Sequence, residues 1–291
     1  MKIVEAEDQR YPALLRQIND PPERLYYKGD WDIDIFRSCL AVVGSRRMTS
    51  YGRRITDELV TKAALSGITI VSGFMFGVDA QAHRAAVSAG GRTIAVMPCG
   101  IDLIHPAHQK DLYAEILEND GLIISEYEND APPVRWMYPA RNRIVAGLSQ
   151  ATLIVEGALK SGSLITAELT KKSGRKLFAV PGPLTSSVSQ GTLQLIKEGA
   201  SMVTGIEDIL EYYGMVSKES SAGSLSQPSL NKLEQSIVEM LAQEPREIDI
   251  LSRLVGVPAS RLGATLSLMQ LKGLINEERG KFYVGKSGVG A

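Results

Sequence analysis

Cysteine, histidine and long hydrophobic runs are all scarce in this sequence of 291 residues. Its two cysteines cannot build a disulfide framework, and its three histidines leave little material for a metal site or for acid–base catalysis. No apolar stretch approaches the roughly 18 residues that a membrane helix needs, and the acidic start is unlike a secretory signal. The net charge of −1 excludes a globally basic nucleic-acid binder but leaves room for a local basic groove. We therefore expect a cytoplasmic protein.

Short apolar runs alternate with helix-length amphipathic segments from residue 39 to residue 213. Each run looks like a strand that is buried on both faces of a sheet. The alternation predicts right-handed crossovers and an α/β domain with a doubly wound parallel sheet, covered by helices on both faces. The predicted strands are residues 40–43, 68–71, 93–97, 122–124, 152–155, 176–180 and 201–203. Helices are predicted at residues 49–64 and 78–88.

Three further segments flank this domain. Residues 1–38 are irregular and are predicted to form an N-terminal strap on the larger domain. Residues 214–230 are rich in Ser and Gly, which is typical of a flexible linker. Residues 231–285 hold three amphipathic helices and a short hairpin, the order of elements in a small winged-helix domain. The three helices are predicted at residues 231–243, 247–255 and 258–272.

Glycines, hydroxyl side chains and an arginine follow several predicted strands. Ligands bind at the carboxyl ends of parallel strands, so we expect these residues to converge on one edge of the sheet. Hydroxyls, helix amides and a guanidinium together suit an oxyanion, either a nucleic-acid phosphate or a nucleotide. The sequence has neither a P-loop nor a dinucleotide-binding glycine motif. The residues concerned are Gly44, Ser45, Arg46, Ser72, Gly73, Ser161, Gly162, Ser163 and Thr166.

A basic and aromatic cluster lies at residues 135–143. Arg141, Asn142 and Arg143 follow Trp136 and Tyr138. Cations that track a backbone and rings that stack on bases suit a strand of nucleic acid. The structural alternative is that Arg143 pairs with a carboxylate and that Trp136 belongs to the core.

The residues that most often carry catalysis do not form a set. His83 lies within a predicted helix, where a buried, hydrogen-bonded histidine is the expected role. His105 and His108 flank Pro106, and together with Cys99 they match no standard zinc spacing. No nucleophile with its base can be assembled, so we expect no catalytic residue, no metal and no cofactor.

Eight motifs follow one another in a fixed order between residues 41 and 200. They are AVVGSR (41–46), SG with GVDAQAH (72–83), TIAV (93–96), SEY (125–127), PARNRIVAGL (139–148), SGSLITA (161–167), PG (181–182) and LIKEGA (195–200). In these motifs the chain resembles the DNA-processing protein A family (DprA/Smf), the single-stranded DNA-binding and RecA-loading factor of natural transformation.

The resemblance implies an extended Rossmann-like domain that dimerises, binds single-stranded DNA, hands it to RecA and displaces single-strand-binding protein. By position, Arg46 becomes the first phosphate ligand, with Gly44 and Ser45 shaping the turn. The remaining residues that the resemblance assigns to DNA are a second lobe of Ser161, Gly162, Ser163 and Thr166, a groove at Arg141 and Arg143, and outer contacts at Lys160 and Lys171.

Two positions depart from the family pattern. Met75 and Phe76 stand where family members usually have Ala and then Arg or Lys, so one basic contact is missing. An aromatic ring takes its place and is a candidate for stacking on a base. Leu193 stands where many members have Asn, which predicts a lower DNA affinity or a differently shaped pocket.

Two other functions remain open from the sequence. A nucleotide-binding enzyme of the phosphoribohydrolase type has a similar domain, but its glycine-rich signature is broken by Pro183 after Pro181 and Gly182. A transcription regulator would read duplex DNA with its winged helix, yet the candidate recognition helix carries one arginine, Arg261. That helix favours a protein-contact or regulatory role. The favoured function is a non-enzymatic mediator that binds single-stranded DNA and loads RecA.

Overall fold

The computed structural model describes residues 2–215, 232–278 and 280–285. The chain divides into two compact units, Met1–Ser217 and Lys218–Ala291. Most of the predicted linker, from residue 216 to residue 230, lies outside the described residues. Among the described residues, no helix is both long enough and apolar enough to cross a membrane.

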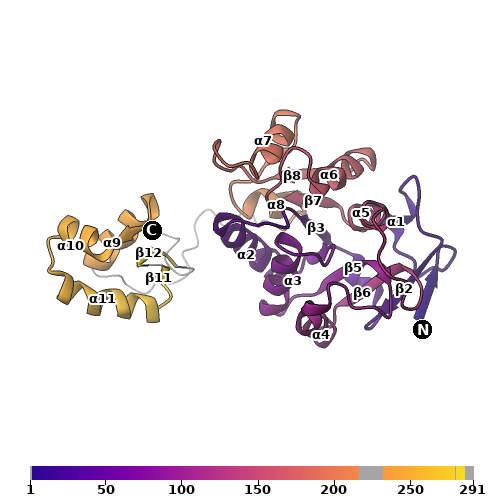
Figure 1. The fold of residues 1–291 in the computed structure, drawn as a ribbon, viewed down its shortest axis with the longest axis horizontal. Coiled ribbons are helices and arrows are strands. Elements are labelled where there is room, and N and C mark those ends of the chain that lie inside the picture. Colours follow the sequence, from indigo (N-terminus) through magenta and orange to yellow (C-terminus); the bar gives the residue numbers. More distant parts are fainter. Residues whose placement is uncertain (1, 216–231, 279, 286–291) are drawn as a thin grey trace. The chain divides into compact units, whose positions relative to one another are not determined.

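A nine-stranded sheet in the order β1-β2-β6-β5-β4-β3-β7-β8-β9 forms the centre of the first unit (Figure 1). The strands from β3 to β9 pair in parallel, which confirms the predicted doubly wound sheet. They are β3 (Cys39–Val43), β4 (Thr69–Ser72), β5 (Thr93–Gly100), β6 (Leu122–Tyr127), β7 (Ala151–Ile154), β8 (Lys176–Ala179) and β9 (Ser201–Met202).

The chain builds this sheet outward in two directions from β3. It proceeds from β3 through β4 and β5 to β6, and then returns to place β7 on the other side of β3. The strand order therefore reverses between β3 and β7. Open α/β sheets bind their ligands at such a reversal, outside the carboxyl ends of the strands.

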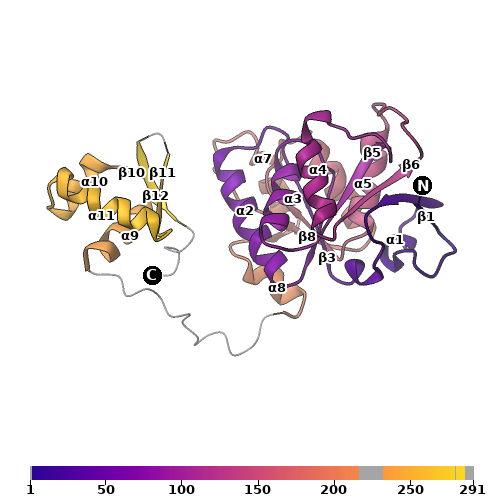
Figure 2. The same ribbon diagram turned by 90° about the horizontal axis from the view of Figure 1, so that it is seen from below.

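Alternating residues of β3 supply two separate cores, one on each face of the sheet. Cys39, Ala41 and Val43 pack on one side, whereas Leu40 and Val42 pack on the other. Figure 2 shows the two helix layers that cover these faces. The first layer holds α5 (Met137–Gly147), α6 (Gly162–Lys172) and α7 (Gln190–Lys197). The second holds α2 (Ser50–Leu65), α3 (Val78–Ser88), α4 (Lys110–Glu118) and α8 (Glu207–Tyr212).

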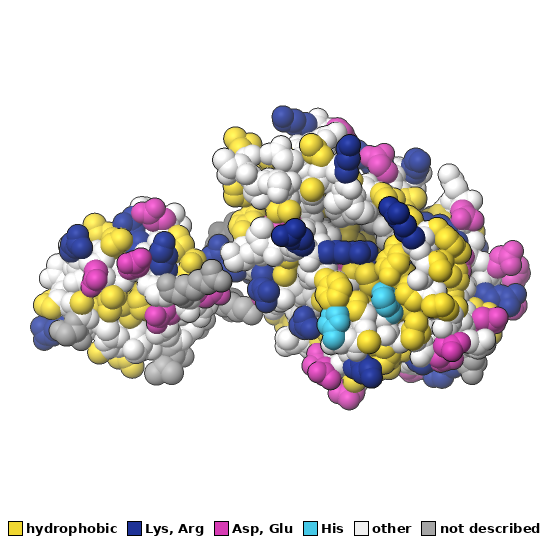
Figure 3. Space-filling model, in the orientation of Figure 1, with side chains coloured by type: hydrophobic (Ala, Val, Ile, Leu, Met, Phe, Trp, Pro, Cys, Tyr) yellow, Lys and Arg dark blue, Asp and Glu magenta, His cyan; other side chains and the backbone are white. Residues whose placement is uncertain are grey.

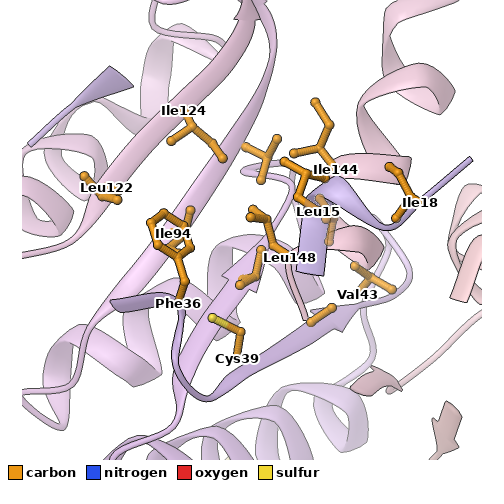
Figure 4. Close-up of a cluster of buried hydrophobic side chains, with 14 of the residues drawn as sticks. Leu15, Ile18, Phe36, Cys39, Val43, Ile94, Leu122, Ile124, Ile144 and Leu148 are labelled. Carbon is orange, nitrogen blue, oxygen red and sulfur yellow. The ribbon is translucent and has the colours of Figure 1, made fainter. Parts of the chain in front are cut away.

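Residues 1–38 are more regular than the sequence pattern indicates. They contribute β1 (Lys2–Glu5) and β2 (Arg24–Lys28), which extend the sheet antiparallel beyond β6, together with the short helices α1 (Ala13–Arg16) and η1 (Ile33–Phe36). Leu15 and Ile18 pack toward α5 in the core of Figure 4. A Cβ at Gly147 would lie 2.8 Å from Cδ1 of Leu15, so a glycine lets this segment pack closely on α5.

The second unit has the predicted order of a winged helix. Helices α9 (Lys232–Gln243), α10 (Ile248–Val255) and α11 (Ala259–Leu271) enclose a core that contains Leu251, Leu262 and Met269. Strand β10 (Arg246–Glu247) pairs with β12 (Lys281–Val284), which pairs with β11 (Ile275–Glu278) to form the wing. Gly256 ends α10 in a left-handed conformation that only glycine adopts readily, and it opens the turn into α11.

Candidate nucleic-acid interface

A cavity of about 1070 Å³ lies at the carboxyl ends of the central strands. Its walls come from the segments that follow β3, β4, β7 and β8, and from α5 with the turn before it. The structure thus brings together most of the residues that the sequence singles out. Those that line the cavity are Gly44, Ser45, Arg46, Gly73, Arg141, Asn142, Ser161, Gly162, Ser163 and Thr166.

The turn after β3 exposes two backbone donors to this cavity. A Cβ at Gly44 would lie 2.6 Å from Cγ2 of Val78, so the turn packs directly on α3. The hydroxyl oxygen of Ser45 accepts a hydrogen bond from the amide of Arg47, 3.1 Å away, which closes the turn. Within the described part of the chain, the amides of Ser45 and Arg46 donate to no acceptor. They are therefore available to an oxyanion.

A buried carboxylate fixes the other end of this loop, at the start of α2. The hydroxyl of Thr49 donates to Oε1 of Glu156 over 2.5 Å, and the amide of Thr49 donates to Oε2 over 2.9 Å. Thr49 also caps the helix by accepting from the amide of Gly52. Glu156 thus connects the segment after β7 to the loop after β3, so hydrogen bonds join the two sides of the strand reversal.

The first turn of α6 forms the opposite wall. Hydroxyls of Ser161 and Ser163 lie 2.7 Å apart and hydrogen-bond to each other. The amides of Gly162 and Ser163 have no acceptor among the residues that the structure covers, as expected at the start of a helix. The 11-residue helix also directs the positive end of its dipole to this point. Two walls of the cavity therefore present hydroxyls and free amides.

Arginines give the cavity a positive charge although the chain is nearly neutral. Arg46, Arg47 and Arg135 line it and are exposed. No carboxylate of the described residues forms an ion pair with any of the three. The guanidinium of Arg46 lies over the ring of Tyr138, 5.3 Å from its centroid. Figure 3 shows Lys and Arg side chains gathered on this face of the larger unit, next to hydrophobic and histidine side chains.

Arg141 has a different position from these three, because it is only 3% exposed. Its Nη1 donates to the carbonyl oxygens of Gly73, which follows β4, and of Val96 in the middle of β5, and it thereby joins both strands to α5. Burial lowers its pKa to about 10, and Asp79 opposes that effect. Burial raises the pKa of Asp79, which lies on the same side of Gly73 and accepts from the amide of Met75. Arg141 therefore supports the floor of the cavity instead of reaching into solvent.

The sequence places Arg143 in the groove, but the structure pairs it elsewhere. Its Nη2 lies 2.6 Å from Glu126 and its Nε lies 2.9 Å from Asp20. Arg143 does not line the cavity, because these two carboxylates hold its guanidinium between β6 and the N-terminal segment. The structural alternative for Arg143 is thus confirmed. The alternative for Trp136 is wrong, since this residue is 60% exposed and lines the cavity.

Three other predicted residues also lie outside the cavity wall. Ser72 is fully buried and donates to the carbonyl of Val42 over 2.6 Å, so it fastens β4 to β3. Lys171 pairs with Glu198 at 2.8 Å and with Glu168 at 3.2 Å. Lys160 is exposed in the turn before α6 but does not line the cavity.

Among the described residues, the histidines join no group that could hold a metal ion. The part of the chain with described coordinates contains no cluster of three or more His, Cys, Asp or Glu side chains that suits a metal ion. His83 is fully buried, and its Nδ1 hydrogen-bonds the hydroxyl of Thr93 over 2.7 Å, which confirms the role predicted for it. Burial lowers the pKa of His83 to about 3. Burial also lowers the pKa of His105, assisted by the charge of Arg46.

Comparison with known proteins decides the family. The model of the DNA recombination-mediator protein A family matches residues 2–214, and the model of the DprA winged-helix domain matches residues 222–281. This chain belongs to the DprA/Smf family. The family is one of DNA-processing, recombination-related proteins.

DprA and Smf proteins from several bacteria are similar along most of the chain. Protein Smf of Escherichia coli K12 is 36% identical over 279 residues, which span 94% of this chain and 74% of that protein. DNA processing protein DprA of Streptococcus pneumoniae R6 is 40% identical over 203 residues, 70% of this chain and 71% of that protein.

Two solved DprA structures share the fold. The X-ray structure of the S. pneumoniae protein has a TM-score of 0.68 and 38% identity, and the match covers 72% of this chain and 73% of that one. A structure of Helicobacter pylori DNA processing protein A, titled for its single-stranded DNA binding mode, has a TM-score of 0.64 and 33% identity. That match covers 72% of this chain and 98% of the other.

Some residues of the cavity wall in this DprA/Smf chain have no local sequence motif that marks them as part of a binding site. Thr49, Ser186, Ser187 and Val188 line the cavity but are not among the residues that the sequence predicts. The segment 186–188 follows the Pro-Gly-Pro sequence at the end of β8, which lies on the same edge as the other turns. The rule that binding residues follow the strand ends could therefore have predicted the segment 186–188. Thr49, by contrast, matches the ordinary pattern of a helix N-cap.

Proposed function

We propose that this chain binds single-stranded DNA in the cavity between the turn after β3 and the first turn of α6. The observation that carries the proposal is the set of exposed, unpaired arginines beside free amides at one strand reversal. Arg46, Arg47 and Arg135 supply charge for the phosphates of a backbone, and the exposed ring of Trp136 supplies a surface for bases. The likeness to the H. pylori protein supports the same ligand.

We further propose that the protein works in recombination as a homodimer that delivers this DNA to RecA and displaces single-strand-binding protein. This role needs binding and release of DNA but no chemical step, so we propose a non-enzymatic mediator of natural transformation. Both cysteines, Cys39 and Cys99, are free and buried, which is compatible with a reducing cytoplasm as the place of action. Membership of the DprA/Smf family supports this role.

Fluorescence anisotropy of labelled oligo-dT tests the DNA site. The substitution Arg46→Ala is expected to weaken binding at least tenfold. Because one phosphate contact is lost, the slope of log affinity against log salt concentration should become shallower by about one. Arg37→Ala is the matched control, because Arg37 is also exposed but precedes β3 and so lies at the opposite edge of the sheet. The affinity of Arg37→Ala for oligo-dT is expected to stay within about twofold of wild type.

Absence of binding by the wild-type protein at low salt would contradict the proposal and favour the nucleotide-binding alternative. The RecA step has its own measurement, the rate of RecA filament nucleation on oligonucleotides covered by single-strand-binding protein. Acceleration by the wild type and none by Arg46→Ala is the expected result. Sedimentation of the wild type tests the homodimer.

A further inference from the structure

Two solvent-exposed aromatic side chains, Phe76 and His108, stack on each other next to the cavity. The ring of Phe76 lies 4.6 Å from the imidazole of His108, centroid to centroid, with 10° between their planes. Phe76 is 45% exposed, and His108 is exposed as well. Aromatic rings ordinarily gain from burial, so a stacked pair that stays exposed to solvent is suited to accept a third ring.

The loops that carry this pair are fastened to each other. Phe74 has a φ of 57°, is fully buried, and accepts a hydrogen bond at its carbonyl from Nε2 of Gln109 over 3.0 Å. Gln109 ends the short helix η2 (Ala107–Gln109), so it directly follows His108. The turn after β4 and the loop after β5 thus hold the two rings in place before any ligand arrives. A ligand that stacks on them loses little affinity to the ordering of side chains.

Both loops also reach the turn that presents Arg46. Gly77, which follows Phe76, packs so closely on the carbonyl of Ser45 that a Cβ there would overlap it. On the other loop, Nε2 of His105 lies 2.9 Å from the hydroxyl of Tyr138, the ring on which Arg46 rests. A phosphate held by the turn after β3 therefore has the pair of rings beside it.

We propose that Phe76 and His108 form a platform on which a nucleobase stacks, next to the phosphate at the turn of Ser45 and Arg46. The inference rests on the proposed function and adds a base-binding subsite to it. In a nucleic acid, the base is one sugar away from its phosphate, which matches a flat aromatic surface beside an oxyanion site. Stacking uses the face that every base has, so this subsite tolerates any sequence.

The experiment compares two ligands, oligo-dT and an abasic oligonucleotide of equal length, which has the same phosphates but no bases. For Phe76→Ala and His108→Ala, the affinity for oligo-dT is expected to fall about tenfold, the size of one base–aromatic stack. Affinity for the abasic ligand is expected to stay within about twofold of wild type. Phe76→Trp keeps a ring and is expected to keep the affinity for oligo-dT.

The matched control is Leu65→Ala, an exposed apolar side chain at the far end of α2 from the cavity. Thermal unfolding checks that each variant folds, and His108→Ala keeps the test valid should Phe76→Ala fail to fold. Equal losses for oligo-dT and the abasic ligand, or no loss for either, overturn the platform. A failed platform leaves binding by the wild type and its loss in Arg46→Ala intact, whereas a wild type that binds no DNA overturns both proposals.

Discussion

The guanidinium of Arg46 rests on the ring of Tyr138, 5.3 Å from its centroid, while Tyr138 in turn hydrogen-bonds His105. Arg46 makes no ion pair within the described chain, so the ring is what orients its charge in the cavity. The relationship joins the turn after β3 to α5, two elements that are about 90 residues apart in the sequence.

Removal of that ring is expected to weaken the binding of single-stranded DNA. Tyr138→Leu deletes a cation–π contact of about 0.5–2 kcal/mol, which predicts a loss of oligo-dT affinity of roughly two- to thirtyfold. Tyr138→Phe keeps the ring and loses only the hydroxyl, so its affinity should remain close to wild type. Anisotropy titrations of both variants give the answer, and an equal loss in the two would show that the hydroxyl, not the ring, supports Arg46.

Gly77 packs against the turn after β3 that carries Ser45 and Arg46, and so helps to fix its position. It has a φ of 73° and packs on the carbonyl of Ser45, so Gly77→Ala has both a strained backbone and an overlap with the turn. We expect this variant to lose roughly 1–3 kcal/mol of unfolding free energy and most of its DNA affinity. Gly90→Ala is the control: Gly90 also has positive φ, at 70°, but a Cβ there meets nothing within 4 Å. Urea unfolding of the two variants separates the overlap from the backbone strain.

Asp79 carries the negative charge nearest to the buried guanidinium of Arg141. Asp79→Asn keeps the shape of the side chain and leaves Arg141 buried without its counter-charge. We expect a loss of roughly 3 kcal/mol of unfolding free energy, because an uncompensated buried charge is costly. The double variant Asp79→Asn, Arg141→Met should lose less than the sum of its two single changes. Strict additivity in urea unfolding would contradict this coupling.

His83 makes the stability of the fold depend on pH. Its pKa falls to about 3 in the folded protein, against 6.5 for a histidine in the unfolded chain, so between these limits the unfolded state binds one more proton. Stability from this group is complete above pH 6.5 and falls by roughly 1.4 kcal/mol for each pH unit below it. His83→Gln should remove about 2 kcal/mol of the difference between pH 7 and pH 5, measured by urea unfolding. The same pH dependence in both proteins would contradict this role.

The parallel sheet could be predicted because its strands are buried on both faces. Residues 39–43 form a continuous apolar run, and the helix that starts at Val78 follows a glycine turn, so both signals are local. The pattern failed at β1, where only Val4 is buried and the neighbouring residues are exposed or half-buried. Such an edge strand is specified by pairing with β2, some 20 residues away, and not by its own composition.

The candidate site could be predicted only as far as it depends on strand ends. Gly44, Ser45 and the first turn of α6 line the same cavity because the parallel strands that precede them all end at the same edge of the sheet. The arginines of α5 differ in their surroundings, and these come from distant segments. Arg143 is held by Asp20, 123 residues earlier, and Arg141 by the carbonyl of Gly73, 68 residues earlier. No local pattern distinguishes an arginine with such partners from one that faces solvent.

The reversal of strand order also determines when the cavity comes into existence. One wall is built by residues 43–79, and the other by residues 135–188. On the ribosome the first wall emerges before the second has been synthesised, so a half-made chain carries the turn of Ser45 and Arg46 without α6. If the cavity binds single-stranded DNA as proposed, we expect that affinity only after the second half of the domain has folded onto the first.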